Sequence, residues 1–256
     1  DTLIAGESSV AGVIDTATSF YRLHGGDGAD SLVGGSLGDG LDGGNGNDTL
    51  LGGGGTDRLT AGAGSNSIDG GDNAGYDLEG NTQGVRDVFD VVNYREVTVG
   101  GVLVNLATGA ATGSGFTDTI ANVEYIQGSL QADTMIGSNA DEGFLSEGSD
   151  TIDGGGGQDW VMVGAANGTL VDLGASTTSG GATLTSIENV RGHSTSASAA
   201  DTLIGDAGNN ILEGGTGNDS LVGGDGIDTA DFRTATSGVF VSLTAGSGTS
   251  SGGAGA

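Results

Sequence analysis

Residues 25–69 read GGDGADSLV, GGSLGDGLD, GGNGNDTLL, GGGGTDRLT and AGAGSNSID, which are five consecutive blocks of nine residues. Their common template is G-G-x-G-x-D-x-U-x, in which U is a large aliphatic residue. The first six positions of the template recur in full from residues 25, 43, 52, 154, 214 and 223. Because a repeat of short, fixed period indicates units that pack against their neighbours, the sequence predicts a solenoid.

Each position of the template has a physical role. Glycines at positions one, two and four allow positive φ and tight turns, so that successive carbonyl oxygens point toward one place. The Asp at position six adds a carboxylate there, and carbonyl and carboxylate oxygens are the hard ligands that calcium prefers. Positions seven to nine are extended and direct one aliphatic side chain per block inward, namely Leu32, Leu41, Leu50, Leu59 and Ile68. A flexible Gly-rich linker would need neither the Asp nor the aliphatic residue at fixed positions.

The period also predicts which acidic residues meet. If each block forms half of a coil, loops on the same side of the solenoid are eighteen residues apart. In the first blocks this spacing pairs Asp30 with Asp48, Asp39 with Asp57, and Asp48 with Asn66. Near the C-terminus it pairs Asp201 with Asp219 and Asn210 with Asp228. In the less regular middle blocks, where Asp141 and Glu142 share the acidic position, the expected ligands are Asp133, Asp150 and Asp159.

Composition indicates that the fold depends on cations. The chain has 256 residues, 56 of them Gly, with no Cys, and 34 acidic against 6 basic residues give a net charge of −28. Such a charge opposes compaction and argues against nucleic acid or anionic membranes as partners. One buried aliphatic side chain contributes about 1.5–3 kcal/mol, whereas ordering the backbone costs about 1–2 kcal/mol for each of nine residues. We therefore predict a chain that is largely disordered without calcium and folds when calcium binds.

A longer period divides the chain into tracts and linking units. V-N-L at 104–106 recurs as V-D-L at 171–173 and V-S-L at 241–243, and NVEYIQG at 122–128 recurs as SIENVRG at 186–192. Strands are expected at 88–94 and 102–106, and a polar loop at 77–86. The linking units are expected to continue the coil with apolar packing in place of metal. The predicted organisation is a partial repeat and covering segment (1–24), a first calcium tract (25–75), a linking unit (76–131), a second tract (132–163), a second linking unit (164–199), a third tract (200–231), and the start of another linking unit with a Gly/Ser tail (232–256).

These nonapeptides resemble the RTX (repeats-in-toxin) family. The resemblance implies an all-β, right-handed parallel β-roll or β-helix solenoid with calcium ions between successive turns. It also implies one-step (type I) secretion from a Gram-negative bacterium and an extracellular or cell-surface location. Leu37, Asn66 and Asn210 depart from the pattern, and the neutral oxygen of an Asn predicts weaker binding. The residues expected to hold calcium are Gly26, Asp27, Gly28, Asp30, Asp39, Gly44, Gly46, Asp48, Gly53, Gly55, Asp57, Asn66, Asp133, Asp150, Gly155, Gly157, Asp159, Asp201, Asn210, Gly215, Gly217, Asp219, Gly224, Gly226 and Asp228.

Signals for an enzyme are weak in this sequence. The G-x-S-x-G match at 34–38 lies inside a nonapeptide, whereas a nucleophile elbow requires a strand-to-helix turn. His24 and His193 have no obvious partners for a metal or catalytic site, and no apolar run approaches the ~20 residues of a membrane span. No signal peptide is visible, and the chain begins within a repeat, so we expect a segment of a longer protein.

The function expected from the sequence is therefore structural and not enzymatic. The first hypothesis is a calcium-dependent β-roll segment of a secreted adhesin or surface-layer protein. Its candidate partners, besides calcium, are copies of itself or cell-surface glycans, without membrane insertion. The alternative is the non-catalytic repeat region of a secreted enzyme, such as a lipase, protease or epimerase, or of a toxin.

Overall fold

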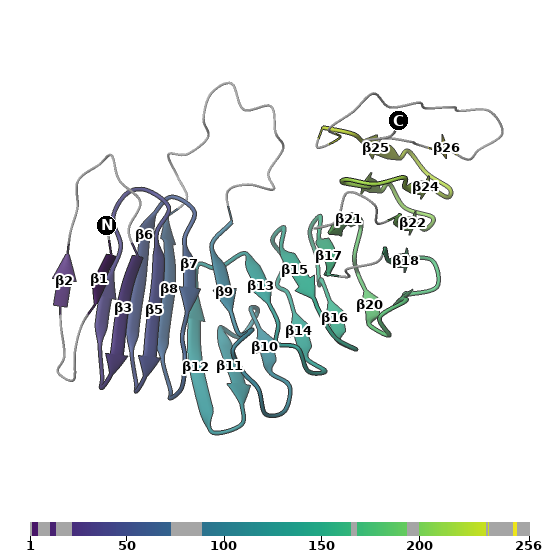
Figure 1. Ribbon diagram of the computed structural model, residues 1–256. Helices are drawn as coiled ribbons and strands as arrows, with labels where there is room; N and C mark the ends of the chain where they lie inside the picture. Colours follow the sequence, from purple (N-terminus) through teal and green to yellow (C-terminus); the bar gives the residue numbers. More distant parts are fainter. Residues whose placement is uncertain are drawn as a thin grey trace. The chain divides into compact units, whose positions relative to one another are not determined.

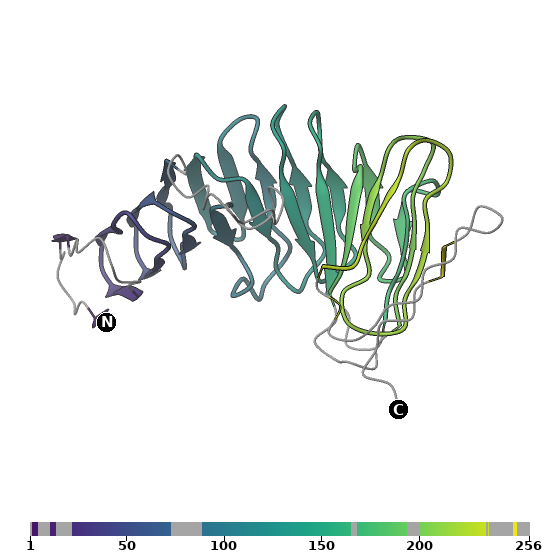
Figure 2. The same ribbon diagram turned by 90° about the horizontal axis from the view of Figure 1, so that it is seen from above.

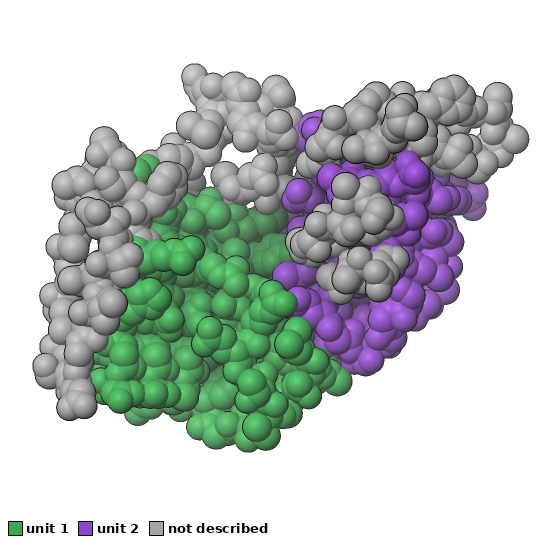
Figure 3. All heavy atoms as spheres, in the orientation of Figure 1, with its two compact units in different colours: residues 1–134 green, residues 135–256 purple. Residues whose placement is uncertain are grey.

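The computed structural model describes residues 2–4, 11–13, 22–72, 89–164, 168–193, 200–233, 235 and 248–249. These residues form short β-strands and no helix (Figure 1), which confirms the all-β prediction. The chain divides into two compact units, residues 1–134 and 135–256, which are coloured separately in Figure 3. The predicted loop at 77–86, the V-S-L copy at 241–243, and most of the covering segment and of the Gly/Ser tail lie outside the described residues.

In the first unit the chain alternates between two sheets, and within each sheet the strands of successive coils run parallel to one another. The first sheet contains β1 (Thr2–Ile4), β3 (Arg22–Asp27), β5 (Gly40–Asn45), β7 (Arg58–Thr60), β9 (Val91–Asn93) and β13 (Tyr125–Gln127). The second contains β2 (Ala11–Val13), β4 (Ser31–Val33), β6 (Thr49–Gly54), β8 (Ser67–Asp72) and β12 (Phe116–Ala121). Two nonapeptides therefore make one coil, as the parallel β-roll requires.

The first calcium tract has a core of stacked aliphatic side chains, one from each of the strands β3 to β8. Leu32, Leu50 and Ile68 align across β4, β6 and β8, and their side chains are at most 4% exposed. Leu41 and Leu59 align in the same way across β5 and β7, and both are buried. All five aliphatic residues predicted to face inward therefore do so, because the two-residue pleat directs alternate side chains to the core.

The second unit repeats this construction. Its first sheet contains β15 (Gly143–Ser146), β17 (Trp160–Gly164), β21 (Asn189–His193), β23 (Ile211–Glu213) and β25 (Thr229–Asp231). Its second sheet follows the order β14 (Thr134–Ile136), β16 (Thr151–Asp153), β20 (Thr183–Thr185), β19 (Thr177–Thr178), β18 (Leu170–Asp172), β22 (Thr202–Ile204), β24 (Ser220–Val222) and β26 (Gly248–Thr249). Figure 2 shows successive coils of this unit as flattened loops, with strands along their long sides.

Each linking unit continues the coil but adds a reversal of the chain that the sequence did not predict. In the first unit β11 (Ala110–Gly113) pairs antiparallel with both β10 (Leu103–Asn105) and β12, while β12 is parallel to β8. In the second unit β19 pairs antiparallel with β18 and β20, and β20 is parallel to β16. The linking units are thus three-stranded antiparallel meanders set within parallel sheets.

The recurring V-[ND]-L motif explains the first reversal in each meander. Asn105 Oδ1 accepts a hydrogen bond from Thr108 N at 3.0 Å, and Asp172 Oδ1 accepts one from Ala175 N at 2.8 Å. A short polar side chain that binds the backbone a few residues ahead stabilises a tight turn. The recurring element of the long period is therefore a turn signal at the end of β10 and of β18.

Candidate calcium-binding loops

Glycines at positions two and four of the repeats have left-handed backbone conformations. Gly44 has a φ of 92° and Gly46 a φ of 143°, and positive values also occur at Gly26, Gly28, Gly53, Gly55, Gly155, Gly157, Gly215, Gly217, Gly224 and Gly226. A Cβ added to Gly44 would overlap the carbonyl oxygen of Gly26, and one added to Gly46 would overlap that of Gly28. Carbonyl oxygens of one coil therefore point toward the next, as calcium coordination between turns would require.

The glycine at position one has a different role from the one predicted. Gly25, Gly43 and Gly52 do not have positive φ. A Cβ on Gly25 would lie 2.5 Å from Asp30 Oδ2 and would overlap the carbonyl oxygen of Gly43. Position one therefore needs glycine for space. We call this arrangement an acid cradle: the position-one residue, the position-six carboxylate of the same repeat, and a carbonyl of the next coil.

The position-six residues form ladders along the stack of coils. In each predicted pair, the backbone N–H of the earlier residue donates to the side-chain Oδ1 of the later one. The distances are 2.9 Å for Asp30 to Asp48, 2.7 Å for Asp39 to Asp57, 2.8 Å for Asp48 to Asn66, 2.9 Å for Asp201 to Asp219 and 3.0 Å for Asn210 to Asp228. The structure thus brings together all five pairs that the eighteen-residue spacing predicted.

Several cradles contain buried carboxylate oxygens that no described residue satisfies. Neither side-chain oxygen of Asp30 has a hydrogen-bond donor among the described residues, and the same holds for the Oδ2 atoms of Asp48, Asp57 and Asp159. These four side chains are at most 2% exposed. A buried ionised oxygen without a partner is costly, so each of these sites fits a bound cation.

The donor set fits calcium in particular. The described residues contain no group of three or more His, Cys, Asp or Glu side chains that could hold a metal ion by themselves. Carbonyl oxygens would therefore have to complete the coordination shell around each carboxylate. Oxygen ligands in a flexible arrangement of carbonyls and carboxylates suit calcium, whereas softer metals prefer nitrogen or sulfur.

Burial changes the protonation of the cradle acids. The pKa of Asp57 is raised to about 8, mainly by burial. A hydrogen bond from Asp39 N lowers this pKa, whereas the charges of Asp90 and Asp39 raise it. Burial likewise raises the pKa of Asp159 to about 7. The pKa of Asp48 is also raised, mainly by burial. Protons can therefore occupy these oxygens in the absence of a metal.

We expect calcium-stripped protein to retain more β-structure at about pH 5 than at about pH 8. Because an unfolded Asp titrates near 3.9, the folded state binds more protons than the unfolded state between about pH 4 and pH 8, and stability falls as pH rises through this range. Far-UV circular dichroism of calcium-free protein at several pH values measures the effect. A β signal that increases with pH would contradict the raised pKa values of Asp57 and Asp159.

A second class of acid is bound by serine. Ser at position two donates its hydroxyl to the acid of the same repeat: Ser129 Oγ lies 2.8 Å from Asp133 Oδ1 and Ser146 Oγ lies 2.6 Å from Asp150 Oδ2. The hydroxyl of Ser138 contacts Glu142 in the same way. Protein hydrogen bonds thus replace part of what a cation would supply at Asp133 and Asp150.

Other predicted ligands occupy different environments. In the irregular block Glu142 occupies the acidic position, since its side chain is only 2% exposed. The neighbouring Asp141 is exposed and accepts a hydrogen bond from Gln158 N. Asp27 is also exposed, and its carboxylate accepts a hydrogen bond from Asn45 Nδ2 at 2.7 Å. These two acids therefore lie on the outside of the loops.

The two Asn residues of the ladders present a donor where Asp would present its second oxygen. Asn66 Nδ2 lies 3.0 Å from Asp118 Oδ1, and Asn210 Nδ2 lies 2.8 Å from the carbonyl oxygen of Glu188. Weaker cation binding at Asn66 and Asn210 remains a prediction, and its reason is that an amide nitrogen is not a calcium ligand.

Four ladder acids in the linking units were missed by the sequence analysis. Asp57 N donates to Asp90 Oδ1 at 2.7 Å, and Asn66 N donates to Asp118 Oδ1 at 2.8 Å. Glu124 and Glu188 accept hydrogen bonds from the backbone N–H groups of the preceding ladder acids, Asp90 and Asp159. All four begin an acid-x-aliphatic triplet, which is the template without its glycines: D-V-V at 90, D-T-I at 118, E-Y-I at 124 and E-N-V at 188. A search for this shorter pattern would have found them.

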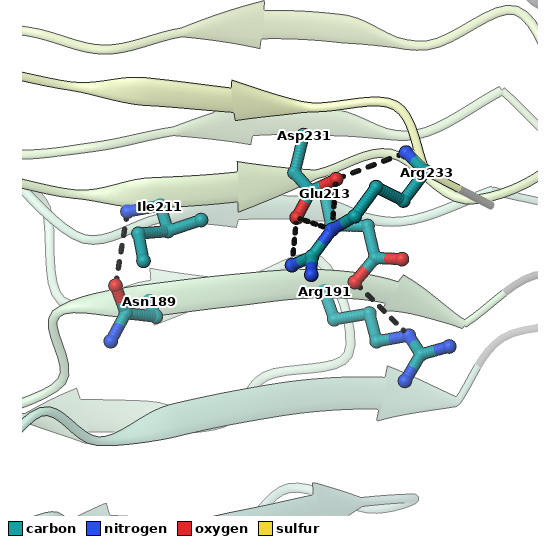
Figure 4. Close-up of polar contacts among 6 residues, drawn as sticks. All are labelled: Asn189, Arg191, Ile211, Glu213, Asp231 and Arg233. Carbon is teal, nitrogen blue, oxygen red and sulfur yellow. Dashed lines mark hydrogen bonds and ion pairs between the residues drawn. The ribbon is translucent and has the colours of Figure 1, made fainter. Parts of the chain in front are cut away.

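Acids on the first sheet of the second unit are neutralised by arginine instead. Figure 4 shows Glu213, which is 2% exposed, with its Oε2 atom 3.3 Å from Arg191 Nε. In the same figure Arg233 Nη2 lies 2.6 Å from Asp231 Oδ2. The chain therefore uses ion pairs on the sheet, whereas the cradle acids Asp30, Asp48, Asp57 and Asp159 have no cationic side chain as a partner among the described residues.

Comparison with protein families identifies the repeats of this chain. The family model of the RTX calcium-binding nonapeptide repeat matches four stretches, residues 22–41, 42–76, 137–170 and 196–230. Among solved structures, the extracellular lipase LipA from Serratia marcescens is matched with 15% identity and a TM-score of 0.19, over 90% of this chain and 34% of that chain. The chain thus spans about a third of the length of that lipase, and comparison with curated proteins gave no match. The chain therefore contains four copies of the RTX calcium-binding nonapeptide repeat.

Proposed function

We propose that this chain is a calcium-dependent structural segment of a secreted adhesin or surface-layer protein, and that its repeats fold outside the cell when calcium binds. The observation that carries the proposal is the set of buried carboxylate oxygens at Asp30, Asp48, Asp57 and Asp159 without donors among the described residues. In calcium-poor cytosol these charges would oppose folding, whereas extracellular calcium would balance them. The net charge of −28 acts in the same direction.

The residues that would hold calcium are the cradle acids together with loop carbonyls such as those of Gly26 and Gly28, which point toward the next coil. Calcium would supply the positive charge that these oxygens lack. Because each position-six side chain also binds the backbone of the preceding coil, ion binding at one loop orders its neighbour. The proposed role of the metal is therefore to join successive coils.

A non-catalytic role is part of the proposal. Ser36, the centre of the G-x-S-x-G match, lies in the loop between β4 and β5, and a strand follows it in place of the helix that a nucleophile elbow needs. No helix that could span a membrane occurs in the part of the chain that the structure describes. Repeat tracts alternate with linking units that contain the same three-stranded meander, and this regular alternation supports a structural role and not an enzymatic one. A parent protein with an upstream catalytic domain would instead favour the repeat region of a secreted enzyme or toxin.

An Asp48→Asn variant tests the proposal, because its expected effects with and without calcium have opposite signs. Asn keeps the acceptor for Asp30 N but removes the buried charge. With calcium, a loss of about 10- to 100-fold in the calcium affinity of this site would lower the free energy of unfolding by about 1.4–2.7 kcal/mol. Without calcium, the variant should retain more β-structure than the wild type. Urea unfolding and circular dichroism measure the two effects.

The matched control for this experiment is Asp141→Asn. Asp141 is an exposed acid of the second tract, Asn keeps the acceptor for Gln158 N, and the substitution should change stability by no more than about 0.5 kcal/mol in either condition. An Asp48→Asn variant as stable as the wild type in calcium would remove the basis of the proposal.

A further inference from the structure

The last full repeat of the second tract has a cradle that the repeats alone do not complete. Asp159 is fully buried, its Oδ1 accepts a hydrogen bond from Glu142 N at 2.8 Å, and its Oδ2 has no donor among the described residues. A Cβ on Gly154 would lie 2.5 Å from that Oδ2 atom and would overlap the carbonyl oxygen of Ser186. Ser186 belongs to the linking unit, so the carbonyl facing this cradle comes from outside the nonapeptides.

Ser186 has the backbone conformation of a loop glycine without being one. Its φ is 50°, and among the described residues only Asn122 and Ser176 are further non-glycine residues with positive φ. A left-handed Ser costs conformational energy that Gly would not. Such a conformation, held where its carbonyl faces a buried carboxylate, points to a functional constraint on the direction of that carbonyl.

Glu188 takes the place that the acidic residue has in a repeat loop. Its Oε2 accepts a hydrogen bond from Asp159 N at 2.9 Å, as Asp48 Oδ1 accepts one from Asp30 N. In a nonapeptide, position one and the acid are five residues apart, whereas Ser186 and Glu188 are two residues apart. The linking unit has thus dropped most of the glycine loop, and the longer side chain of Glu replaces that of Asp.

The first unit contains the same arrangement with different residues. Asp90 N donates to Glu124 Oε2 at 3.1 Å. A Cβ on Gly70 would lie 2.5 Å from Asp90 Oδ2 and would overlap the carbonyl oxygen of Asn122, whose φ is also 50°. The shortened loop is therefore a repeated feature of the linking units.

We propose that each linking unit supplies one side of a further calcium site, in which a carbonyl from a left-handed residue and a Glu carboxylate lie opposite a buried Asp. In the second unit the site consists of Asp159, Ser186 and Glu188, and in the first unit of Asp90, Asn122 and Glu124. All of these residues except Asp159 lie outside the stretches matched by the RTX repeat model. The inference rests on the proposed function in taking calcium as the cation, and it extends the metal sites beyond the nonapeptides.

The position of Trp160 allows a local test of the site in the second unit. Trp160 is the only Trp of the chain and directly follows Asp159. Terbium binds to the same oxygen ligands as calcium and emits when a nearby excited Trp transfers energy to it. We expect the wild-type chain to show Trp-sensitised terbium emission that calcium displaces, and Asp159→Asn to abolish that emission.

The decisive variant is Glu188→Gln. Gln keeps an acceptor for Asp159 N but removes the charge, so the affinity of the site should fall. The terbium and calcium concentrations at the midpoints of the sensitised signal should rise at least about tenfold. The matched control is Asp172→Asn, since Asp172 belongs to the same linking unit and its turn with Ala175 N survives the change. This control should bind like the wild type. Circular dichroism in calcium establishes that each variant is folded.

The outcomes separate this inference from the proposed function. Wild-type midpoints in Glu188→Gln, together with loss of the signal in Asp159→Asn, would mean that the repeats complete the site alone, and only the inference would be wrong. Absence of calcium-displaceable emission in the wild-type chain, with no effect of calcium on its fold, would overturn both. If Glu188→Gln does not fold in calcium, Glu188→Asp replaces it, because Asp keeps the charge on a shorter side chain. This variant should show a smaller but measurable loss of ion affinity. Unchanged midpoints in Glu188→Asp would again contradict the inference.

Discussion

Calcium-stripped protein is expected to lose most of its far-UV β signal, and added calcium is expected to restore the signal cooperatively. The reason lies in the cradles, where the fold buries the carboxylates of Asp30, Asp48, Asp57 and Asp159 without protein donors among the described residues. One buried aliphatic side chain per strand, such as Leu50, cannot offset this cost together with the ordering of Gly-rich loops. The transition should fall at about 10⁻⁴–10⁻³ M calcium, the range of extracellular modules.

The shape of the transition follows from the ladders. Because Asp30 N binds Asp48 and Asp48 N binds Asn66, each ordered loop presents the next with a formed partner. A stack of units that interact with their nearest neighbours folds with a steep dependence on the stabilising ligand. Magnesium is the control, since it requires near-octahedral geometry and retains its waters. A β-rich spectrum that calcium does not change would mean that the meanders carry the fold without metal.

The second large effect is expected from two alanine substitutions at the same position of successive coils. Gly28 and Gly46 both occupy position four, with φ values of 125° and 143°. A Cβ at Gly46 would overlap the carbonyl oxygen of Gly28, whereas a Cβ at Gly28 would have no heavy atom within 4 Å. We therefore expect Gly28→Ala to cost about 1–3 kcal/mol, the range for a residue held in an unfavourable conformation.

Gly46→Ala should cost more than Gly28→Ala, because it adds a steric clash with the backbone of the adjacent coil to the same conformational strain. The clash cannot be relieved by a rotamer change, since both partners are main chain, and the two coils would have to separate. Urea unfolding in saturating calcium measures the difference between the two variants. Equal losses of stability would show that left-handed strain alone, and not the close approach of coils, makes glycine necessary at position four.

Local periodicity allowed much of the fold to be predicted from the sequence. The burial of Leu32, Leu50 and Ile68 follows from a nine-residue period with one aliphatic residue per block, because a strand directs alternate side chains to one face. The Asp30–Asp48 contact follows from the same period, since two blocks form one coil. These features depend on residues that are close in sequence and repeat without interruption.

The candidate site was predicted less completely, because several of its contacts depend on where the chain returns after a detour. Asn66 N meets Asp118 only after the meander of the linking unit has added β10 and β11 and brought β12 back beside β8. The role of Gly25 is likewise visible only when Asp30 and the next coil lie against it. The acid-x-aliphatic triplet marks Asp118 in the sequence, but only the fold shows that Asn66 is its partner, because 52 residues separate the two.

The sequence by itself thus determined the coil, its period, the inward aliphatic residues and the acids of the regular repeats, since each follows from local geometry repeated at a fixed spacing. Only the tertiary structure decided the rest. It showed which acids receive serine hydroxyls or arginine and which remain without donors among the described residues, such as Asp48 and Asp159. It also placed Ser186 and Glu188 of a linking unit against Asp159. The physical reason is that the partners of a buried charge such as Asp159 are set by the packing of coils, which brings together residues that are distant in the sequence.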